Sequence, residues 1–335
     1  MSASASASAP PPLEYAVVQG DEDFDASMSE EEKNIIGTGK VPIHREGRFR
    51  SPFAHPRFGG PTKVKVGLVL DNVFEYDIQK GAFEAAFFLS LTGDKELPDM
   101  SLTYSNGKEV ETTTIVDSPT FKFLRVRGAF QSPVDLRKYP FDTQELAIEI
   151  EDQKAGVDQL LFVPDQNRTA LDEGFSVAGW DIASMGAKAY RHLYPPRFDR
   201  DDLYVSRYKF SLGLERFGVS AALSVFVPAI VIVLISLTGM WVPPDELEVR
   251  SNTGAPMLAA AVLFHYSLIQ SLPATGYLTR ADKMMMAVYV CLLFNMISTW
   301  FFVVVNERHV ELAFKIARAV VPPLSVGVMV ASAIL

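Results

Sequence analysis

Two hydrophobic periods divide the chain near residue 216. From Pro61 to Arg216, apolar and polar residues alternate, as they do at Val64, Val66, Leu68 and Leu70. A period of two is typical of strands that bury one face. After residue 216 the chain instead contains uncharged hydrophobic spans of membrane-helix length. The pattern predicts a β-domain over residues 61–216, followed by a helical domain over residues 217–335.

Turn signals separate the predicted strands, at residues 105–107, 118–119, 163–165 and 194–196. Because no convincing helical pattern lies between them, we expect an antiparallel, immunoglobulin-like β-sandwich. The hydrophobic spans predict four transmembrane helices, at about 217–242, 246–272, 281–306 and 312–335. The expected fold class is therefore a β + α membrane protein, with a β-sandwich followed by a four-helix transmembrane bundle.

Residues 1–60 are expected to form a poorly ordered tail. The first twelve residues are of low complexity, and Glu14–Glu32 contains eight acidic residues and no Lys or Arg. Such a segment buries too little apolar area to offset its ordering entropy. It lacks the basic and apolar regions of a signal peptide. Export of the β-domain then requires either insertion directed by the first membrane helix or a leader absent from this sequence.

Charge and motif content exclude several function classes. The net charge of −9 argues against nucleic acid as a partner. The single cysteine, Cys291, leaves neither a disulfide framework nor a cysteine-based metal site. No hydrolase, metalloprotease, P-loop or dinucleotide-binding motif is present. We therefore expect no enzyme activity, no cofactor and no metal.

The second hydrophobic span is too polar for a helix that touches only lipid. It has no Asp, Glu, Lys or Arg between Arg250 and Arg280. One face, at a spacing of about 3.5 residues, contains Asn252, Pro256, Ala259, Leu263, Tyr266 and Gln270. Such a stripe either faces water inside a bundle or binds the helix to its neighbours. His265 lies beside this stripe, where a packing histidine bonded between helices is favoured over a proton sensor.

The run Tyr139-Pro140-Phe141-Asp142-Thr143-Gln144 resembles the signature of the pentameric ligand-gated ion channels, also called the Cys-loop receptor superfamily. Ser132 and Leu146 stand where eukaryotic members place the two loop cysteines, so the resemblance is to prokaryotic-style members without that disulfide. Further family features follow in the family's order over residues 61–335: Arg216 before the first membrane helix, Pro228 within it, and Pro273 at the end of the second.

The resemblance implies a homopentamer in the cell membrane, with the β-domain extracytoplasmic and the second helix lining a central pore. Glu248 would form a carboxylate ring that favours cations, so monovalent cations are the expected permeant ions. The alternative for Glu248 is a solvated charge in a loop. Leu263, with Tyr266, would form an apolar gate, although ordinary packing between helices explains both residues as well. The expected function is a ligand-gated, cation-selective ion channel. The alternative is a non-conducting membrane receptor or binding module of the same fold.

The family also implies a coupling region, where the signature run presses on the linker after the second helix. Here that pairs Tyr139, Pro140, Phe141 and Asp142 with the segment from Pro273 to Thr279, while a turn at Asp77 approaches the same place. Asp142 and Arg216 are expected to attract each other there. The alternative for Asp142 is a carboxylate that caps a turn.

Aromatic residues gather around Pro195-Pro196, in the hairpin that corresponds to the family's ligand-capping loop: Tyr190, Tyr194, Phe198 and Tyr204. By cation–π attraction they could enclose an amine, or they could stabilise a hairpin as cross-strand pairs. The agonist is left open as either a small molecule or a proton.

Overall fold

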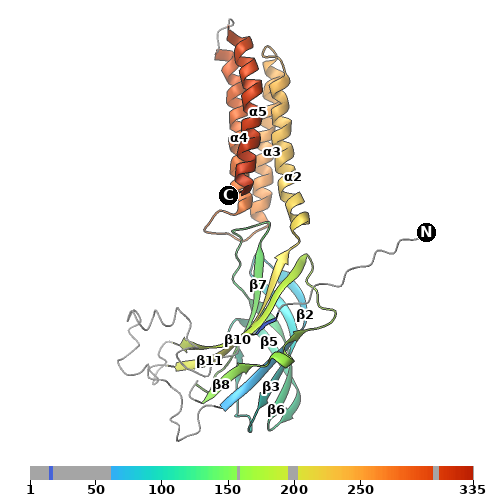
Figure 1. Ribbon diagram of the computed structural model, residues 1–335, viewed down its shortest axis with the longest axis vertical. Helices are drawn as coiled ribbons and strands as arrows, with labels where there is room; N and C mark the ends of the chain where they lie inside the picture. The colour runs from blue at the N-terminus through green and yellow to red at the C-terminus, as the bar shows by residue number, and fades with distance from the viewer. Residues whose placement is uncertain (1–14, 18–61, 157–158, 195–202, 305–308, 335) are drawn as a thin grey trace, which may run out of the picture. The chain divides into compact units, whose positions relative to one another are not determined.

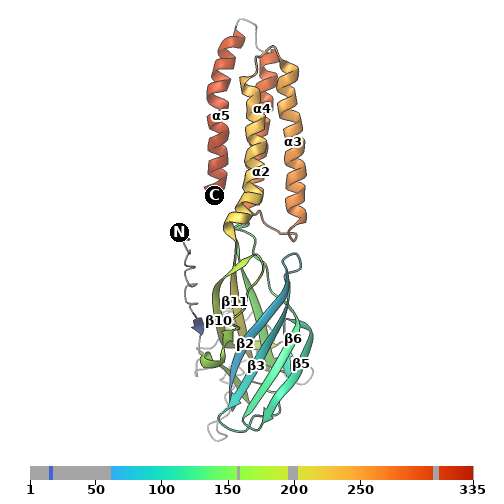
Figure 2. The same cartoon turned by 90° about the vertical axis from the view of Figure 1, so that its right-hand side faces the viewer.

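The computed structural model describes residues 15–17, 62–156, 159–194, 203–304 and 309–334 (Figures 1 and 2). The chain divides into two compact units. One contains the residues up to Pro133 together with Glu145–Leu214, and the other contains Val134–Gln144 together with Glu215–Leu335. The division thus differs from a simple cut at residue 216, because Val134–Gln144, hereafter the signature loop, clusters with the helices.

The β-domain consists of two sheets (Figure 1). The five-stranded sheet has the order β1-β10-β11-β7-β4, formed by Tyr15–Val17, Trp180–Tyr194, Leu203–Arg216, Thr143–Asp152 and Leu102–Tyr104. The six-stranded sheet has the order β5-β6-β3-β2-β8, formed by Gly107–Ser118, Phe121–Gln131, Ala82–Gly93, Thr62–Asp77 and Leu160–Pro164, and β9 (Ala170–Leu171) pairs with β2. A short 3₁₀ helix, η2, spans Gln166–Arg168.

One hydrophobic core joins the inner faces of the two sheets. Strand β2 contributes Val64, Val66, Leu68 and Leu70, each at most 2% exposed. Strands β7 and β11 contribute their alternate apolar residues in the same way. The predicted period of two is therefore the period of burial, because successive side chains of a strand point to opposite faces.

The sandwich is not wholly antiparallel, contrary to expectation. Strand β2 pairs in parallel with β8, from Thr62 opposite Leu160 to Val66 opposite Pro164, and also with β9. Parallel neighbours need a long connection between them, and the whole segment from β3 to β7 separates β2 from β8. The turn signals report only neighbouring hairpins, so they did not reveal these pairs.

The predicted tail contributes one short strand to the β-domain. Strand β1, Tyr15–Val17, pairs in parallel with Met185–Ala187 of β10. An edge strand presents unpaired backbone groups that can accept such a segment. The rest of the predicted tail lies outside the described residues.

Four helices follow the β-domain and lie beside one another (Figures 1 and 2). They are α2 (Gly218–Thr238), α3 (Leu247–Gln270), α4 (Arg280–Val304) and α5 (Val310–Ile334), and the 3₁₀ turn η3 (Gly239–Trp241) extends α2. Three segments in the described part of the chain are long and apolar enough to cross a membrane: Gly218–Trp241, Arg280–Phe302 and Val310–Ser332. Helix α3, which contains the polar stripe, is not among them.

The helices share a second core centred on α4. It contains Met284, Met285, Val288, Cys291 and Leu292 of α4, packed against apolar residues of α2, α3 and α5. Cys291 is buried there as a free thiol.

Candidate pore, coupling and ligand sites

The polar stripe of α3 faces away from its own bundle. All seven predicted pore residues have exposed side chains in the protomer: Glu248, Asn252, Pro256, Ala259, Leu263, Tyr266 and Gln270. The buried residues of α3 are Arg250, Gly254 and Ala261, on another side of the helix. A side chain added at Gly254 would meet Met296 of α4 at 3.3 Å, so the small residue allows close packing there. The stripe is therefore not used to bind α3 to its own neighbours.

The outer half of the stripe presents its two largest side chains to open space. Leu263 is 69% exposed and Tyr266 is 59% exposed. The amide of Gln270 donates a hydrogen bond to the Tyr266 hydroxyl oxygen at 2.7 Å, one turn further along the same face. Helix α3 continues through Pro256 without a break, although proline cannot donate the usual backbone hydrogen bond.

Arg250 points away from the stripe and into the helical bundle. Its side chain donates a hydrogen bond to the Val242 carbonyl at 2.6 Å. Its guanidinium lies over the rings of Phe302 and Phe314, at 4.7 and 5.7 Å from their centroids. The residue is 1% exposed. The first turn of α3 thus separates its two charges, with Glu248 exposed on the stripe and Arg250 buried in the bundle.

His265 bridges α3 and α4, as expected for a histidine bonded between helices. Its Nδ1 lies 3.0 Å from the Tyr289 hydroxyl, and its Nε2 lies 3.3 Å from a carboxylate oxygen of Asp282. Asp282 also accepts hydrogen bonds from the backbone N–H and the hydroxyl of Thr279, both at 2.8 Å. Sequence reasoning did not identify Asp282 or Tyr289 as partners, because helical spacing alone does not reveal the register between two helices.

Asp142 and Arg216 form a two-pronged ion pair. The guanidinium Nε and Nη2 lie 2.7 and 3.1 Å from the two carboxylate oxygens. The Asp142 side chain is fully buried, and that of Arg216 is 19% exposed. Gln144 donates a further hydrogen bond to Asp142 at 2.6 Å, and the Arg216 guanidinium lies 5.2 Å from the centre of the Tyr139 ring. This geometry is the strong form of a charged hydrogen bond.

The signature loop is hydrogen-bonded to the segment between α3 and α4 and to the first turn of α4. The Ala281 N–H donates to the Tyr139 carbonyl at 3.2 Å, and the Leu136 N–H donates to the Tyr277 hydroxyl oxygen at 2.8 Å. The ring of Phe141 stacks on Phe226 of α2, with 5.8 Å between centroids. Tyr277 lies within the linker segment that was expected to face the signature run, although it was not singled out. Sequence reasoning missed Phe226, since nothing in its local pattern distinguishes it from an ordinary aromatic residue.

The other predicted coupling residues have local roles. Pro273 is half-buried, just after the end of α3, and the peptide bond between Tyr139 and Pro140 is cis. Asp77 caps its own turn: its carboxylate accepts from the N–H groups of Gln79 and Lys80, at 2.9 and 3.2 Å. An ion pair and hydrogen bond with Lys80 lower the pKa of Asp77. The approach of this turn to the linker stays a prediction.

Ser132 connects the two chain segments that a disulfide would join in eukaryotic members. Its hydroxyl oxygen accepts a hydrogen bond from the Ala147 N–H at 2.8 Å, and its own N–H donates to the Gly81 carbonyl at 2.8 Å. The neighbouring Leu146 is 2% exposed in the core. A buried serine thus connects β6 to β7 through a hydrogen bond.

Only part of the predicted aromatic ligand site lies within the described structure. Tyr190 is half-buried in β10, and the ammonium group of Lys188 lies 5.6 Å from its ring centre. Tyr194 and Tyr204 belong to β10 and β11, but their side chains lie outside the described residues, as does all of Phe198.

Beside Tyr190 lies a buried charge cluster that sequence reasoning missed, formed by Arg207, Glu149 and Glu151. Arg207 reaches Glu151 through Nε at 3.1 Å and Glu149 through Nη1 at 3.1 Å. Burial raises the pKa of Tyr190, and the nearby charge of Glu149 raises it further. Burial lowers the pKa of His192, and Arg207 acts in the same direction. The alternation in β7 and β11 signalled the two faces of each strand, but not which charges would meet.

Comparisons with known proteins agree with this arrangement. No protein-family model matches the chain. The chain is 24% identical to the proton-gated ion channel of Gloeobacter violaceus over 282 residues, which cover 76% of the chain and 74% of that relative. It is 22% identical to the gamma-aminobutyric acid receptor subunit rho-1 of Mus musculus over 262 residues, which cover 68% of the chain and 53% of that subunit. It is 23% identical to the gamma-aminobutyric acid receptor subunit beta-4 of Gallus gallus over 171 residues, which cover 50% of the chain and 33% of that subunit.

These relatives are channel and receptor proteins, so the prediction that the chain is not an enzyme is confirmed. The chain is a membrane protein in which an extracytoplasmic β-domain precedes the membrane helices. The relatives, the order of β-domain and helices, and the signature loop show that the chain belongs to the pentameric ligand-gated ion channels of the Cys-loop receptor superfamily.

Proposed function

We propose that the chain forms a ligand-gated, cation-selective channel in which α3 from each of five identical protomers lines a central pore. The observation that carries this proposal is the exposure of all seven stripe residues on α3, in a helix whose opposite side is packed. A row of amide, hydroxyl and carboxylate groups at membrane depth is costly in lipid. Identical copies around a shared axis would place these groups against water instead.

Cation selectivity follows from Glu248. Its side chain is exposed in the first turn of α3, whereas the nearby Arg250 is withdrawn into the bundle. Five carboxylates at one end of a pore would concentrate cations and repel anions. Monovalent cations are accordingly the proposed permeant ions.

The gate is proposed at Leu263, with Tyr266 one turn outward. Rings of exposed apolar side chains can close a narrow pore by expelling water. The Tyr266–Gln270 hydrogen bond holds the aromatic ring against the same face of α3. The resting pore is therefore closed in the outer half of the helix.

Coupling is proposed to pass through the signature loop. This loop is fixed to the pre-helix arginine by the Asp142–Arg216 pair. The Leu136 N–H holds it to the segment between α3 and α4, and the Tyr139 carbonyl holds it to the first turn of α4. It also continues directly into strand β7 of the β-domain. A displacement of that strand would therefore act on the start of α2 and the end of α3 together.

The agonist is proposed to act at the β-domain, near Tyr190. A proton is one candidate, because a relative is named as proton-gated and His192 lies against the Arg207 cluster. An amine attracted by the aromatic residues and by Glu149 is the other. Both act on the same side of the five-stranded sheet.

Recording from the purified full chain in planar bilayers tests the proposal. Currents should appear as pH, calcium or a panel of amines is varied, and the reversal potential in a KCl gradient should follow potassium. Glu248→Gln should reduce cation preference, whereas Glu246→Gln, at an exposed acid two residues earlier, should change it less. If no stimulus yields current from an intact assembly, the chain is the non-conducting receptor instead. A reversal potential near that of chloride contradicts the selectivity alone.

A further inference from the structure

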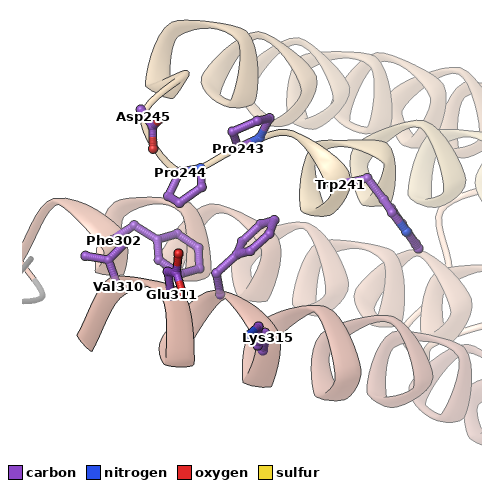
Figure 3. Close-up of a pocket in the computed structure, with 9 residues that line it drawn as sticks. Trp241, Pro243, Pro244, Asp245, Phe302, Val310, Glu311 and Lys315 are labelled. Atoms are coloured by element: carbon purple, nitrogen blue, oxygen red, sulfur yellow. The ribbon is translucent and has the colours of Figure 1, made fainter. Parts of the chain in front are cut away.

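A cavity of about 810 Å³ lies at the end of the helical unit where the α2–α3 connection meets α4 and α5 (Figure 3). Three of its lining residues are ends of candidate membrane spans. Trp241 ends the first span, Phe302 ends the second, and Val310 begins the third. The cavity is therefore level with the membrane boundary. Because the β-domain is extracytoplasmic and precedes α2, this boundary is the cytoplasmic one.

Three charged side chains line this cavity: Asp245 from the α2–α3 connection, and Glu311 and Lys315 from α5 (Figure 3). All three are exposed. Within the described ranges none of them forms an ion pair, although side chains of both signs line the cavity. The cavity thus presents an acidic pair and a separate basic group to whatever enters it.

Further positive charge lies behind the cavity walls. The rings of Phe302 and Phe314 line the cavity, and the buried Arg250 guanidinium lies over both. Two of its nitrogen atoms, Nε and Nη2, have no hydrogen-bond partner in the described structure. Arg318 lies over Trp241 in the same way, 5.7 Å from the ring centre. Uncompensated cations at membrane depth attract an anion.

We propose that this cavity binds the headgroup of a phospholipid that has a primary amine, of the phosphatidylethanolamine type, from the cytoplasmic leaflet. The phosphate would lie toward Lys315 and the arginines, and the ammonium would donate hydrogen bonds to Asp245 and Glu311. A lipid is favoured over a soluble phosphate ester because the exposed apolar residues Leu312 and Ile316 flank Lys315 on α5 and offer a surface to acyl chains.

A primary amine is favoured over a quaternary one for a geometric reason. Quaternary ammonium groups are held by the faces of aromatic rings. In this cavity, arginine guanidinium groups already lie over the rings of Trp241, Phe302 and Phe314. The carboxylates of Asp245 and Glu311 remain as the groups that can bind the ammonium. Carboxylates bind best to an ammonium group that can donate hydrogen bonds.

Native mass spectrometry of the purified full-length assembly tests this proposal with three lipids of matched acyl chains: phosphatidylethanolamine, phosphatidylcholine and phosphatidylglycerol. The unmodified chain should bind the first about five- to tenfold more tightly than the other two, as expected for one or two charged hydrogen bonds. The Asp245→Asn and Glu311→Gln double variant should bind all three alike. Lys315→Gln should weaken the binding of each.

Arg280→Gln removes a positive charge at the opposite membrane boundary and serves as the matched control, for which lipid preference should not change. Each variant is compared at the same oligomer mass, so that misfolding is detected separately. Equal binding of the three lipids to the unmodified chain overturns the proposal. So does an ethanolamine preference that survives in the double variant. Because lipid binding is measured without ion flow, the result is independent of whether the chain conducts.

Discussion

The Asp142–Arg216 pair offers the most quantitative test of the coupling region. The two partners differ in burial: the Asp142 carboxylate is fully buried, whereas the Arg216 guanidinium is 19% exposed. Removing one partner of a buried pair costs about 3–5 kcal/mol, because the other charge is left unpaired. The cost should therefore depend on which partner is removed.

Arg216→Gln should lower the free energy of unfolding by about 3 kcal/mol, since it leaves a buried carboxylate with only the Gln144 amide as a side-chain donor. Asp142→Asn should lower it by about 2 kcal/mol, because the arginine that remains can be partly hydrated. The double variant should lose little more than Arg216→Gln alone, which corresponds to a coupling energy of about 2 kcal/mol.

Equilibrium unfolding of the purified assembly in detergent supplies the four free energies of this double-mutant cycle. Lys65→Gln is a suitable control, because its ion pair with Asp94 is 3.4 Å long and both side chains are more than half exposed. Its effect should stay within about 1 kcal/mol. The reasoning is refuted if the two single changes add within about 0.5 kcal/mol, or if Asp142→Asn is the costlier one.

Three further predictions concern the pore and the β-domain. Leu263→Ser should raise resting current or agonist sensitivity by making the proposed neck wettable; unchanged bilayer currents would place the gate elsewhere. Arg207→Met should destabilise the β-domain by about 3 kcal/mol, because it leaves the buried Glu151 without its cation; denaturant unfolding measures this, and a neutral effect contradicts it. Because burial and Arg207 lower the pKa of His192 from 6.5, its neutral form stabilises the fold above that pH, and this contribution is lost as the pH falls. Thermal unfolding at pH 7 and pH 5 should therefore differ less in His192→Gln than in the unmodified chain, and an equal difference would refute the assignment.

Local pattern determined the elements of this protein. Strands such as β2 and β11 follow from alternation, because every second residue of a strand meets the same core. The helices follow from long uncharged spans, and their observed bounds lie within about four residues of those expected. The polar stripe of α3 and the signature residues from Tyr139 to Asp142 were likewise readable in the sequence, together with the family that they indicate.

Tertiary structure alone decided several contacts between distant elements. It placed β8 parallel to β2, joined Arg207 to Glu149 and Glu151, and set His265 against Asp282. It also brought Trp241, Phe302 and Lys315 to one cavity. Hydrophobic periodicity specifies the face on which a side chain lies, but the register between distant elements depends on how whole faces pack. The family resemblance had paired Asp142 with Arg216, but the partners of Arg207 and Asp282 became known only when the chain was folded.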